Sequence, residues 1–294
     1  MSDQAFSLDE VKVIGVLGAG QMGGGIAQTA AQSGFHVLLA DASLAHAEGG
    51  KAKIQKGLSK LVEKGKLTQA QVSEILEKIQ PVADLSAFSK AQLVVEAVTE
   101  KKDLKFKLFK ELSEKCGPRT LLATNTSSIS ITEIAAQTAR PHLVAGMHFM
   151  NPVPVMKLVE GIKAIQTDPA VFKTIRGVAE KMGKTFVEAR DIPGFAVNRI
   201  LMPMINEAVQ ALYEGIASVE DIDTAMKLGT NQPMGPLTLA DFIGLDTCLS
   251  IMEVLHEGLG DSKYRPSPLL RQYVLAGWLG KKSGRGFYKY EENR

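Results

Sequence analysis

The chain has 294 residues, of which 45% are hydrophobic and 22% charged, and its formal net charge is only +2 at pH 7. This length allows two domains with a large core, and the balanced charge argues against a nucleic-acid or membrane-surface partner. No run approaches the roughly 18 apolar residues of a membrane span, and residues 1–10 lack the apolar core of a secretory signal. The two cysteines form no metal-binding spacing. We therefore expect a cytoplasmic globular protein with reduced cysteines and no metal.

The stretch Val11–Gly25, VKVIGVLGAGQMGGG, is typical of a buried strand that enters a glycine turn and then a helix. Gly18, Gly20 and Gly23 have the spacing G-x-G-x-x-G. The first glycine allows the tight turn, the second lets a pyrophosphate approach the backbone, and the third lets the helix pack close to the strand. The free N–H groups and positive dipole end of the helix favour phosphate binding there. This stretch predicts a dinucleotide site.

The next elements support that prediction. A helix is expected over 21–33, with Gly34 just past its end, and a second strand over 35–40 stops at Asp41. An acid about 20 residues beyond the glycines holds the ribose hydroxyls of NAD and repels the 2′-phosphate of NADP. The alternative, a glycine turn without a ligand, is disfavoured because the whole strand–turn–helix–strand unit is present.

Two helices are expected next, one capped by Ser43 and running to about residue 64, the other over 69–79 and ended by Pro81. They form a helical-hairpin insertion in the dinucleotide fold. On the first helix, four lysines share one face, and Glu63 is the only acid of the segment 51–66: Lys53, Lys56, Lys60 and Lys64. A solvated surface is the ordinary interpretation of such a face.

Alternating strand and helix signals then resume. Strands are expected over 92–98, 120–124, 143–149, 157–162 and 185–188, and helices over 101–115, 130–138 and 169–182. On the helix over 101–115, the expected core stripe is Leu104, Leu108, Phe109 and Leu112. Ser130 and Glu133 have the spacing of a capping box. The polar run 125–128 follows a strand at the sheet edge where open α/β sheets bind ligands.

His148 has the position of a catalytic histidine, because it ends a predicted strand at that edge. The sequence Asn-Pro-Val-Pro at 151–154 predicts a turn. A reversal near Pro154 places residues 148 and 160 equally far from the bend, so Glu160 would face His148 across an antiparallel pair. A carboxylate on one imidazole nitrogen fixes the tautomer and favours the charged ring, which suits a general base. A surface salt bridge is the alternative.

Beyond residue 190 the signals become almost entirely helical. Helices are expected over 195–213, over 219–228 with Ser218 as N-cap, near 237–258 and over 267–276, followed by a glycine-rich loop over 278–288. The predicted fold class is α/β: a Rossmann-type NAD-binding domain over residues 1–190, followed by a smaller all-α domain over residues 191–294. The apolar run 200–205 is more than one thin layer can cover and predicts a homodimer built on the second domain.

The chain resembles the (S)-3-hydroxyacyl-CoA dehydrogenase family, and within it the bacterial short-chain members that act on 3-hydroxybutyryl-CoA. The resemblance runs from Val11 to Tyr290 and rests on specific motifs. These are GAGQMG at 18–23, NTSS at 125–128, HFMNP at 148–152, Glu160, PGFAVNR at 193–199 and GKKSGRGFY at 280–288.

The resemblance implies that His148 is the catalytic base with Glu160 as its partner, and that Ser127 and Asn198 hold the C3 oxygen and thioester region of the substrate. It implies a homodimer and assigns the lysine helix to the CoA phosphates, with Lys56 and Lys60 as substrate-binding candidates. Together with the glycine turn and Asp41, these assignments give the full set of expected NAD contacts: Gly18, Gly20, Gln21, Met22, Gly23, Asp41, Glu100, Lys105, Asn125, Ser127, Asn151 and Lys282.

The resemblance implies interconversion of (S)-3-hydroxybutyryl-CoA and acetoacetyl-CoA, with hydride transfer between C3 and NAD, and the predicted NAD turn and histidine base agree with this chemistry. Two alternatives stay open. One is a related dehydrogenase of a free hydroxy acid or sugar acid, which would have little use for the lysine face. The other is an NAD-binding protein without catalytic activity.

Overall fold

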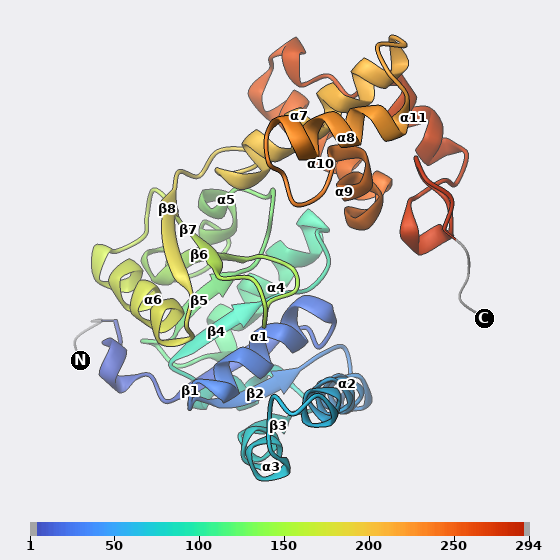
Figure 1. Ribbon diagram of the computed structural model, residues 1–294. Helices are drawn as coiled ribbons and strands as arrows, with labels where there is room; N and C mark the ends of the chain where they lie inside the picture. Colours follow the sequence, from blue (N-terminus) through green and yellow to red (C-terminus); the bar gives the residue numbers. More distant parts are fainter. Residues whose placement is uncertain (1–4, 291–294) are drawn as a thin grey trace. The chain divides into compact units, whose positions relative to one another are not determined.

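The structure, a computed structural model, describes residues 5–290. It divides between Asp191 and Ile192 into two compact units. The first contains the whole β-sheet and the second is helical (Figure 1). This is the expected fold class, an α/β nucleotide-binding fold followed by a helical domain.

An eight-stranded sheet forms the centre of the first unit. The strand order is β3-β2-β1-β4-β5-β6-β7-β8, and every neighbouring pair is parallel except β6 and β7. The strands are β1 (Val13–Leu17), β2 (His36–Ala40), β3 (Ile79–Pro81), β4 (Leu93–Glu96), β5 (Leu121–Thr124), β6 (Val144–Phe149), β7 (Leu158–Lys163) and β8 (Thr185–Ala189). The order reverses at β1, and such a switch point is where open parallel sheets bind ligands at the carboxyl ends of the strands.

From residue 5 to residue 191 the structure describes six α-helices: α1 (Gln21–Gln32), α2 (Leu44–Glu63), α3 (Gln69–Glu77), α4 (Lys102–Lys115), α5 (Ile131–Ala135) and α6 (Pro169–Lys181). The predicted N-cap of α2 is confirmed, because the Ser43 side chain accepts a hydrogen bond from the backbone N–H of His46. The C-terminal end of α1 is also confirmed, since Gly34 follows it with φ +91°. Three 3-10 helices join these elements: Leu8–Glu10, Leu85–Lys90 and Pro141–Leu143.

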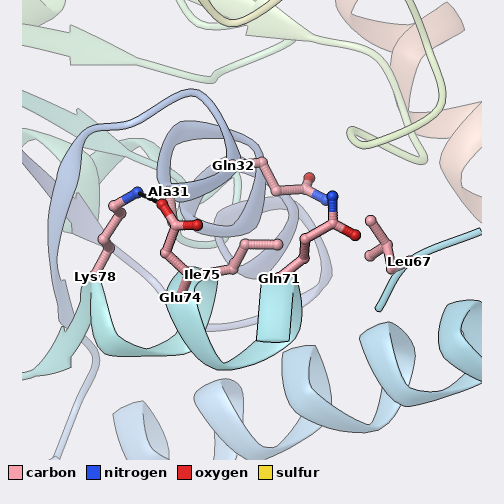
Figure 2. Close-up of a pocket in the computed structure, with 7 residues that line it drawn as sticks. All are labelled: Ala31, Gln32, Leu67, Gln71, Glu74, Ile75 and Lys78. Atoms are coloured by element: carbon pink, nitrogen blue, oxygen red, sulfur yellow. Dashed lines mark hydrogen bonds and ion pairs between the residues drawn. The ribbon is translucent and has the colours of Figure 1, made fainter. Parts of the chain in front are cut away.

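The prediction was wrong at the end of α3. The helix ends at Glu77, and residues 79–81 pair with β2 as the edge strand β3. Pro81 therefore belongs to a strand, where an edge position tolerates its missing N–H. Where α3 meets the C-terminal end of α1, a hollow opens on the surface (Figure 2), lined by Ala31, Gln32, Leu67, Gln71, Glu74, Ile75 and Lys78.

The prediction of the α4 core face also needs correction. Leu104 is 39% exposed, whereas Lys105 is only 1% exposed and lies on the buried face with Phe109 and Leu112. At α5, Ser130 caps the helix as expected, but the helix is shorter than predicted and no capping box forms. The Glu133 carboxylate pairs instead with Lys102 of α4 at 2.7 Å.

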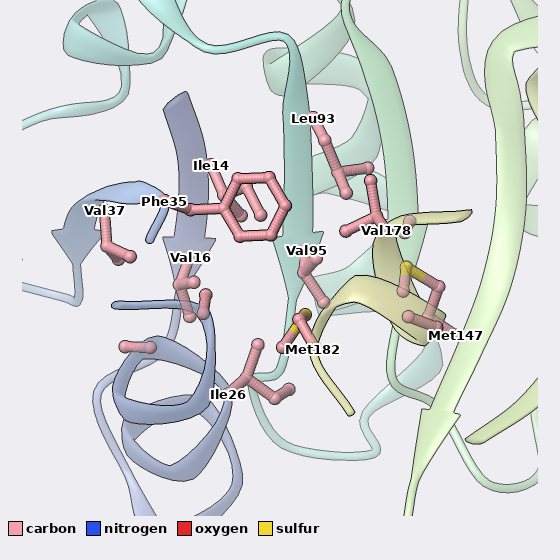
Figure 3. Close-up of a cluster of buried hydrophobic side chains, with 14 of the residues drawn as sticks. Ile14, Val16, Ile26, Phe35, Val37, Leu93, Val95, Met147, Val178 and Met182 are labelled. Atoms are coloured by element: carbon pink, nitrogen blue, oxygen red, sulfur yellow. The ribbon is translucent and has the colours of Figure 1, made fainter. Parts of the chain in front are cut away.

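The main core lies between the sheet and helices α1 and α6 (Figure 3). Ile14 and Val16 of β1 point into it, together with Ile26 of α1 and Val178 of α6. The intervening Gly15 faces the opposite side of the sheet, where a Cβ would lie 2.8 Å from the Phe88 ring. Both faces of β1 are therefore covered, which explains its unbroken apolar sequence.

In the second unit, as described up to residue 290, five α-helices surround a separate core: α7 (Val197–Tyr213), α8 (Val219–Gly229), α9 (Pro236–Ile243), α10 (Leu245–Leu259) and α11 (Pro268–Leu275). Ser218 caps α8, as predicted. The helical region near 237–258 is divided at Gly244, whose φ of +102° ends α9. Two further 3-10 helices, Ser262–Tyr264 and Lys281–Ser283, complete the unit.

Candidate active site

The centre of the candidate site is a buried histidine–carboxylate pair. His148 of β6 and Glu160 of β7 are direct partners in the antiparallel ladder. The His148 Nδ1 atom lies 2.7 Å from Glu160 Oε2, and the two residues are 7% and 0% exposed. The hairpin expected from the symmetric spacing about Pro154 is confirmed. Because the carboxylate is fully removed from water, the pair is a buried contact and not a surface salt bridge.

The glycine turn at the end of β1 has the geometry of a phosphate-binding site. Gly18 has φ +104°, and a Cβ at Gly23 would overlap the carbonyl oxygen of Gly18. At Gly20 a Cβ would meet nothing within 4 Å, so the side of the turn that a ligand would approach is open. Gly20 is also the N-cap of α1 and provides no side chain to cap it. The first backbone N–H groups of α1 therefore suit a pyrophosphate.

Asp41 lies beside this turn at the end of β2. Its carboxylate accepts hydrogen bonds from the backbone N–H groups of Ala19 and Ala42, each at 2.6 Å. The two oxygens keep lone pairs for further donors, since an ionised carboxylate has about four acceptor sites. This arrangement fits two ribose hydroxyls next to the pyrophosphate. The glycine turn and Asp41 together therefore fit NAD.

Side-chain amides hold the β6–β7 hairpin to the start of α1 and to the loop after β5. The Gln21 side chain, on the first residue of α1, donates to Asn151 Oδ1 at 2.9 Å. Asn125, just after β5, accepts from the backbone N–H of Phe149 at 2.8 Å. Phe149 directly follows His148, so the loop after β5 is fixed next to the histidine.

Glu100 and Ser127 are joined across neighbouring strand ends. The Ser127 Oγ donates to Glu100 Oε1 at 3.0 Å, and its backbone N–H donates to the same oxygen. The Thr126 hydroxyl also donates to this carboxylate, at 2.8 Å. The loop after β4 and the loop after β5 are therefore held to each other at the carboxyl edge of the sheet.

Beneath them lies a charged network that sequence reasoning missed. Lys105 Nζ lies 2.7 Å from Glu96 Oε1 and 3.4 Å from Glu100 Oε2, and Thr124 donates to Glu96 Oε2 at 2.7 Å. Glu96 and Lys105 are 0% and 1% exposed, and removing one member of such a pair costs about 3–5 kcal/mol. The signal was present, because Glu96 interrupts the apolar strand LVVEAV.

Two predicted site residues belong to the second unit. Asn198 is the second residue of α7 and is 8% exposed. Lys282 lies in the 3-10 helix Lys281–Ser283, and its Nζ donates to Asp246 Oδ2 at 2.7 Å.

The lysine face of α2 is solvent-exposed at all four positions. Helix α2 passes directly beside the glycine turn, since a Cβ at Gly50 would lie 2.6 Å from the Cβ of Ala19. The lysines start one turn after Gly50, with Lys53, and continue toward the end of the helix. They form a single-signed strip that leads away from the dinucleotide turn.

The hollow of Figure 2 lies at the opposite end of α1 from the glycine turn. Gln32 ends α1, whereas Gln21 begins it. At a rise of ~1.5 Å per residue the hollow is roughly 16 Å from the glycine turn.

Within the part of the chain that the structure describes, no group of three or more His, Cys, Asp or Glu side chains could hold a metal ion. None of the helices in that part is long and apolar enough to cross a membrane.

Comparisons with known proteins agree with this geometry. Residues 13–192 match the family model "3-hydroxyacyl-CoA dehydrogenase, NAD binding domain", so the cofactor of the first unit is NAD. Residues 194–290 match "3-hydroxyacyl-CoA dehydrogenase, C-terminal domain".

Two similar curated proteins are a probable 3-hydroxybutyryl-CoA dehydrogenase of Bacillus subtilis and a 3-hydroxybutyryl-CoA dehydrogenase of Bradyrhizobium diazoefficiens. The first is 59% identical over 96% of this chain and 99% of the relative, and the second is 53% identical over 95% and 96%. The crystal structure of (S)-3-hydroxybutyryl-CoA dehydrogenase from Ralstonia eutropha has a TM-score of 0.94 and 46% identity, covering 96% of this chain and all of that one. The chain therefore belongs to the 3-hydroxyacyl-CoA dehydrogenase family and is an enzyme of it.

Proposed function

We propose that the protein interconverts (S)-3-hydroxybutyryl-CoA and acetoacetyl-CoA, with NAD as the hydride carrier. The observation that carries the proposal is the buried His148–Glu160 pair, on the same sheet as the glycine turn of the NAD site. The names of the relatives support the choice of acyl group, because both curated relatives are described as 3-hydroxybutyryl-CoA dehydrogenases.

His148 acts in this proposal as general base and acid. With its Nδ1–H donated to Glu160, the imidazole presents Nε2 as the proton acceptor. Nε2 takes the proton of the C3 hydroxyl in the oxidative direction, and the imidazolium is stabilised by the Glu160 carboxylate. In the reductive direction the imidazolium returns that proton to the C3 carbonyl oxygen of acetoacetyl-CoA.

The chain's contribution to the cofactor is binding and orientation. NAD, when bound, accepts the hydride from C3 or, as NADH, supplies it. We assign the pyrophosphate to the glycine turn and the adenosine ribose to Asp41. The remaining residues that we assign to the NAD site are Gln21, Met22, Glu100, Lys105, Asn125, Ser127, Asn151 and Lys282. Lys105 is buried under Glu100, so it acts mainly by fixing that carboxylate.

Ser127 and Asn198 are assigned to the substrate's C3 oxygen and thioester. The Ser127 hydroxyl belongs to the strand-end loop fixed by Asn125 next to His148. Asn198 comes from the second unit, which gives that unit a role in substrate binding. The 3′-phosphate and pyrophosphate of CoA need positive charge far from C3, and we assign them to the lysine strip, with Lys56 and Lys60 at its centre.

We further propose that the enzyme is a cytoplasmic homodimer and that the dimer forms through the second unit. Several apolar side chains of this unit are largely exposed, among them Ile200 at 73%, Ile216 at 71%, Leu228 at 81% and Leu275 at 87%. Apolar area of this kind is typical of an interface between subunits. Sedimentation at micromolar concentration should give a dimer, and a monomer alone would contradict the assignment.

A substrate comparison tests the proposed function. The rate of NADH oxidation is measured with acetoacetyl-CoA, with acetoacetate, and with a short thioester that lacks the nucleotide part of CoA. We expect turnover with acetoacetyl-CoA and little with acetoacetate. Turnover of the free acid alone would favour a hydroxy-acid dehydrogenase. NADH binding without turnover of any of the three would indicate a non-catalytic NAD-binding protein.

A further inference from the structure

One buried cation has no part in the mechanism described so far. Lys184 precedes β8 and is only 6% exposed. Its ammonium donates to the backbone carbonyl oxygens of Val153 and Met156, the latter at 2.8 Å. Among the described residues, no carboxylate forms an ion pair with Lys184. Its buried charge is therefore stabilised by these two carbonyl groups.

Both carbonyls belong to the loop 151–156, which joins β6 to β7 and so connects His148 with Glu160. The loop is a single helical turn, in which the N–H groups of Val155 and Met156 both donate to the carbonyl oxygen of Pro152, at 3.0 Å each. A helical turn ends in carbonyl groups without intrahelical partners, and a lysine ammonium is one of the groups that satisfies them. Lys184 therefore fixes the end of this turn.

The other side of the same loop packs on helix α1. A Cβ at Gly25 would lie 2.8 Å from the Cβ of Val153 and 3.4 Å from Pro154 Cδ, so the loop approaches α1 as closely as a glycine permits. Val153 is 1% exposed, and Asn151 accepts from Gln21 one turn before Gly25. The loop is thus held between Lys184 and the helix whose N-terminus forms the NAD site.

Burial of the Lys184 ammonium carries a desolvation cost. Burial lowers the pKa of the Lys184 ammonium, and the neighbouring charge of Lys157 lowers it further. Removing the ammonium alone leaves the Val153 and Met156 carbonyl oxygens without this donor, at a cost of about 1–3 kcal/mol for each buried acceptor. The ammonium fixes the position of the loop, because it donates directional hydrogen bonds to two carbonyl oxygens of that loop.

We propose that Lys184 is a positioning residue that seats the loop 151–156 against α1 and thereby aligns the catalytic hairpin with the cofactor helix. The alignment of His148 rests on the proposed function, whereas the effect on the NAD site does not. Lys184 acts through Val153 and Met156, whose carbonyl oxygens it holds, and we assign it no contact with cofactor or substrate.

The first test replaces the ammonium by a thioether. NADH binding to Lys184→Met is measured by the fluorescence of the bound nucleotide, without acyl substrate, together with the thermal midpoint. We expect a Kd for NADH raised about 10-fold, measured well below the thermal midpoint of the variant, which the two unpaired carbonyl oxygens lower. Lys157→Met, which removes an exposed charge from the chain just after the same loop, should bind NADH normally. An unchanged Kd in Lys184→Met, measured well below its midpoint, would overturn the proposal.

The second test moves the loop from its opposite side. Gly25→Ala improves the helix propensity of α1 but pushes on Val153, whereas a Cβ at Gly24 meets only Ala19 O at 3.8 Å and Ile54 at 3.9 Å. Gly25→Ala should weaken NADH binding as Lys184→Met does, and Gly24→Ala should not. If both variants act through one loop, their effects in the double variant are less than additive. Additive effects would contradict a shared loop, whatever the turnover of acetoacetyl-CoA proves to be.

Discussion

The contribution of Glu160 can be isolated by the substitution Glu160→Gln, which keeps the side-chain volume and removes the charge. Glu160 lies on β7 between β6 and β8, so the ladders on both sides keep the strand in place. A hydrogen bond to a charged group contributes roughly 1.5–3 kcal/mol. When it is lost in the transition state, where the imidazolium forms, kcat falls by about 10- to 150-fold. A glutamine amide that turns its N–H toward Nδ1 also imposes the wrong tautomer, which increases the loss.

The assay is NADH oxidation with saturating acetoacetyl-CoA, and NADH affinity is measured separately to show that the cofactor site is intact. Glu188→Gln on the adjacent strand is the matched control, because Glu188 pairs on the surface with Lys163 and Arg176. We expect the control to keep the wild-type kcat. If Glu160→Gln folds, binds NADH and also keeps the wild-type kcat, then the carboxylate does not assist His148 and the reasoning is refuted.

Three further predictions address other parts of the protein. Asp41→Ala should narrow the preference for NADH over NADPH in kcat/KM, and equal wild-type values for the two cofactors would contradict the role of Asp41. Replacing both Lys56 and Lys60 by Gln should raise the KM for acetoacetyl-CoA, and this increase should be smaller at high salt. The KM for a thioester that lacks the nucleotide should stay unchanged. Equal effects on both substrates would assign these lysines to a solvated face. Burial raises the pKa of the Cys116 and Cys248 thiols to about 12, so roughly one thiol in 10⁴ is ionised at pH 8. Because the thiolate is the reactive form, iodoacetamide should label the folded protein far more slowly than the unfolded one.

The parts of the fold that could be predicted are those that local patterns determine. The glycine turn is one, because a tight turn and close helix packing require glycine whatever surrounds them. The β6–β7 hairpin is another: the prolines at 152 and 154 locate the bend, and strand periodicity then pairs His148 with Glu160. From these two features the sequence predicts both the cofactor turn and the geometry of the candidate base.

The features that could not be predicted depend on partners distant in the sequence. On α4, periodicity favours Leu104 for the core, but Glu96 at the end of β4 draws Lys105 inward and leaves Leu104 39% exposed. Residues 79–81 become a strand because β2 offers an unpaired edge, which no local signal reports. Lys184 is similar, since its role depends on a loop 28–31 residues away.

The most direct test of the account is the turnover of His148→Gln with acetoacetyl-CoA and NADH. General acid–base catalysis is typically worth about 10²- to 10⁴-fold, and we expect a loss of kcat in that range. NADH affinity should stay at the wild-type value, because the glycine turn and Asp41 are untouched. A variant that binds NADH and turns over acetoacetyl-CoA at nearly the wild-type rate would contradict the claim that His148 transfers the proton at C3.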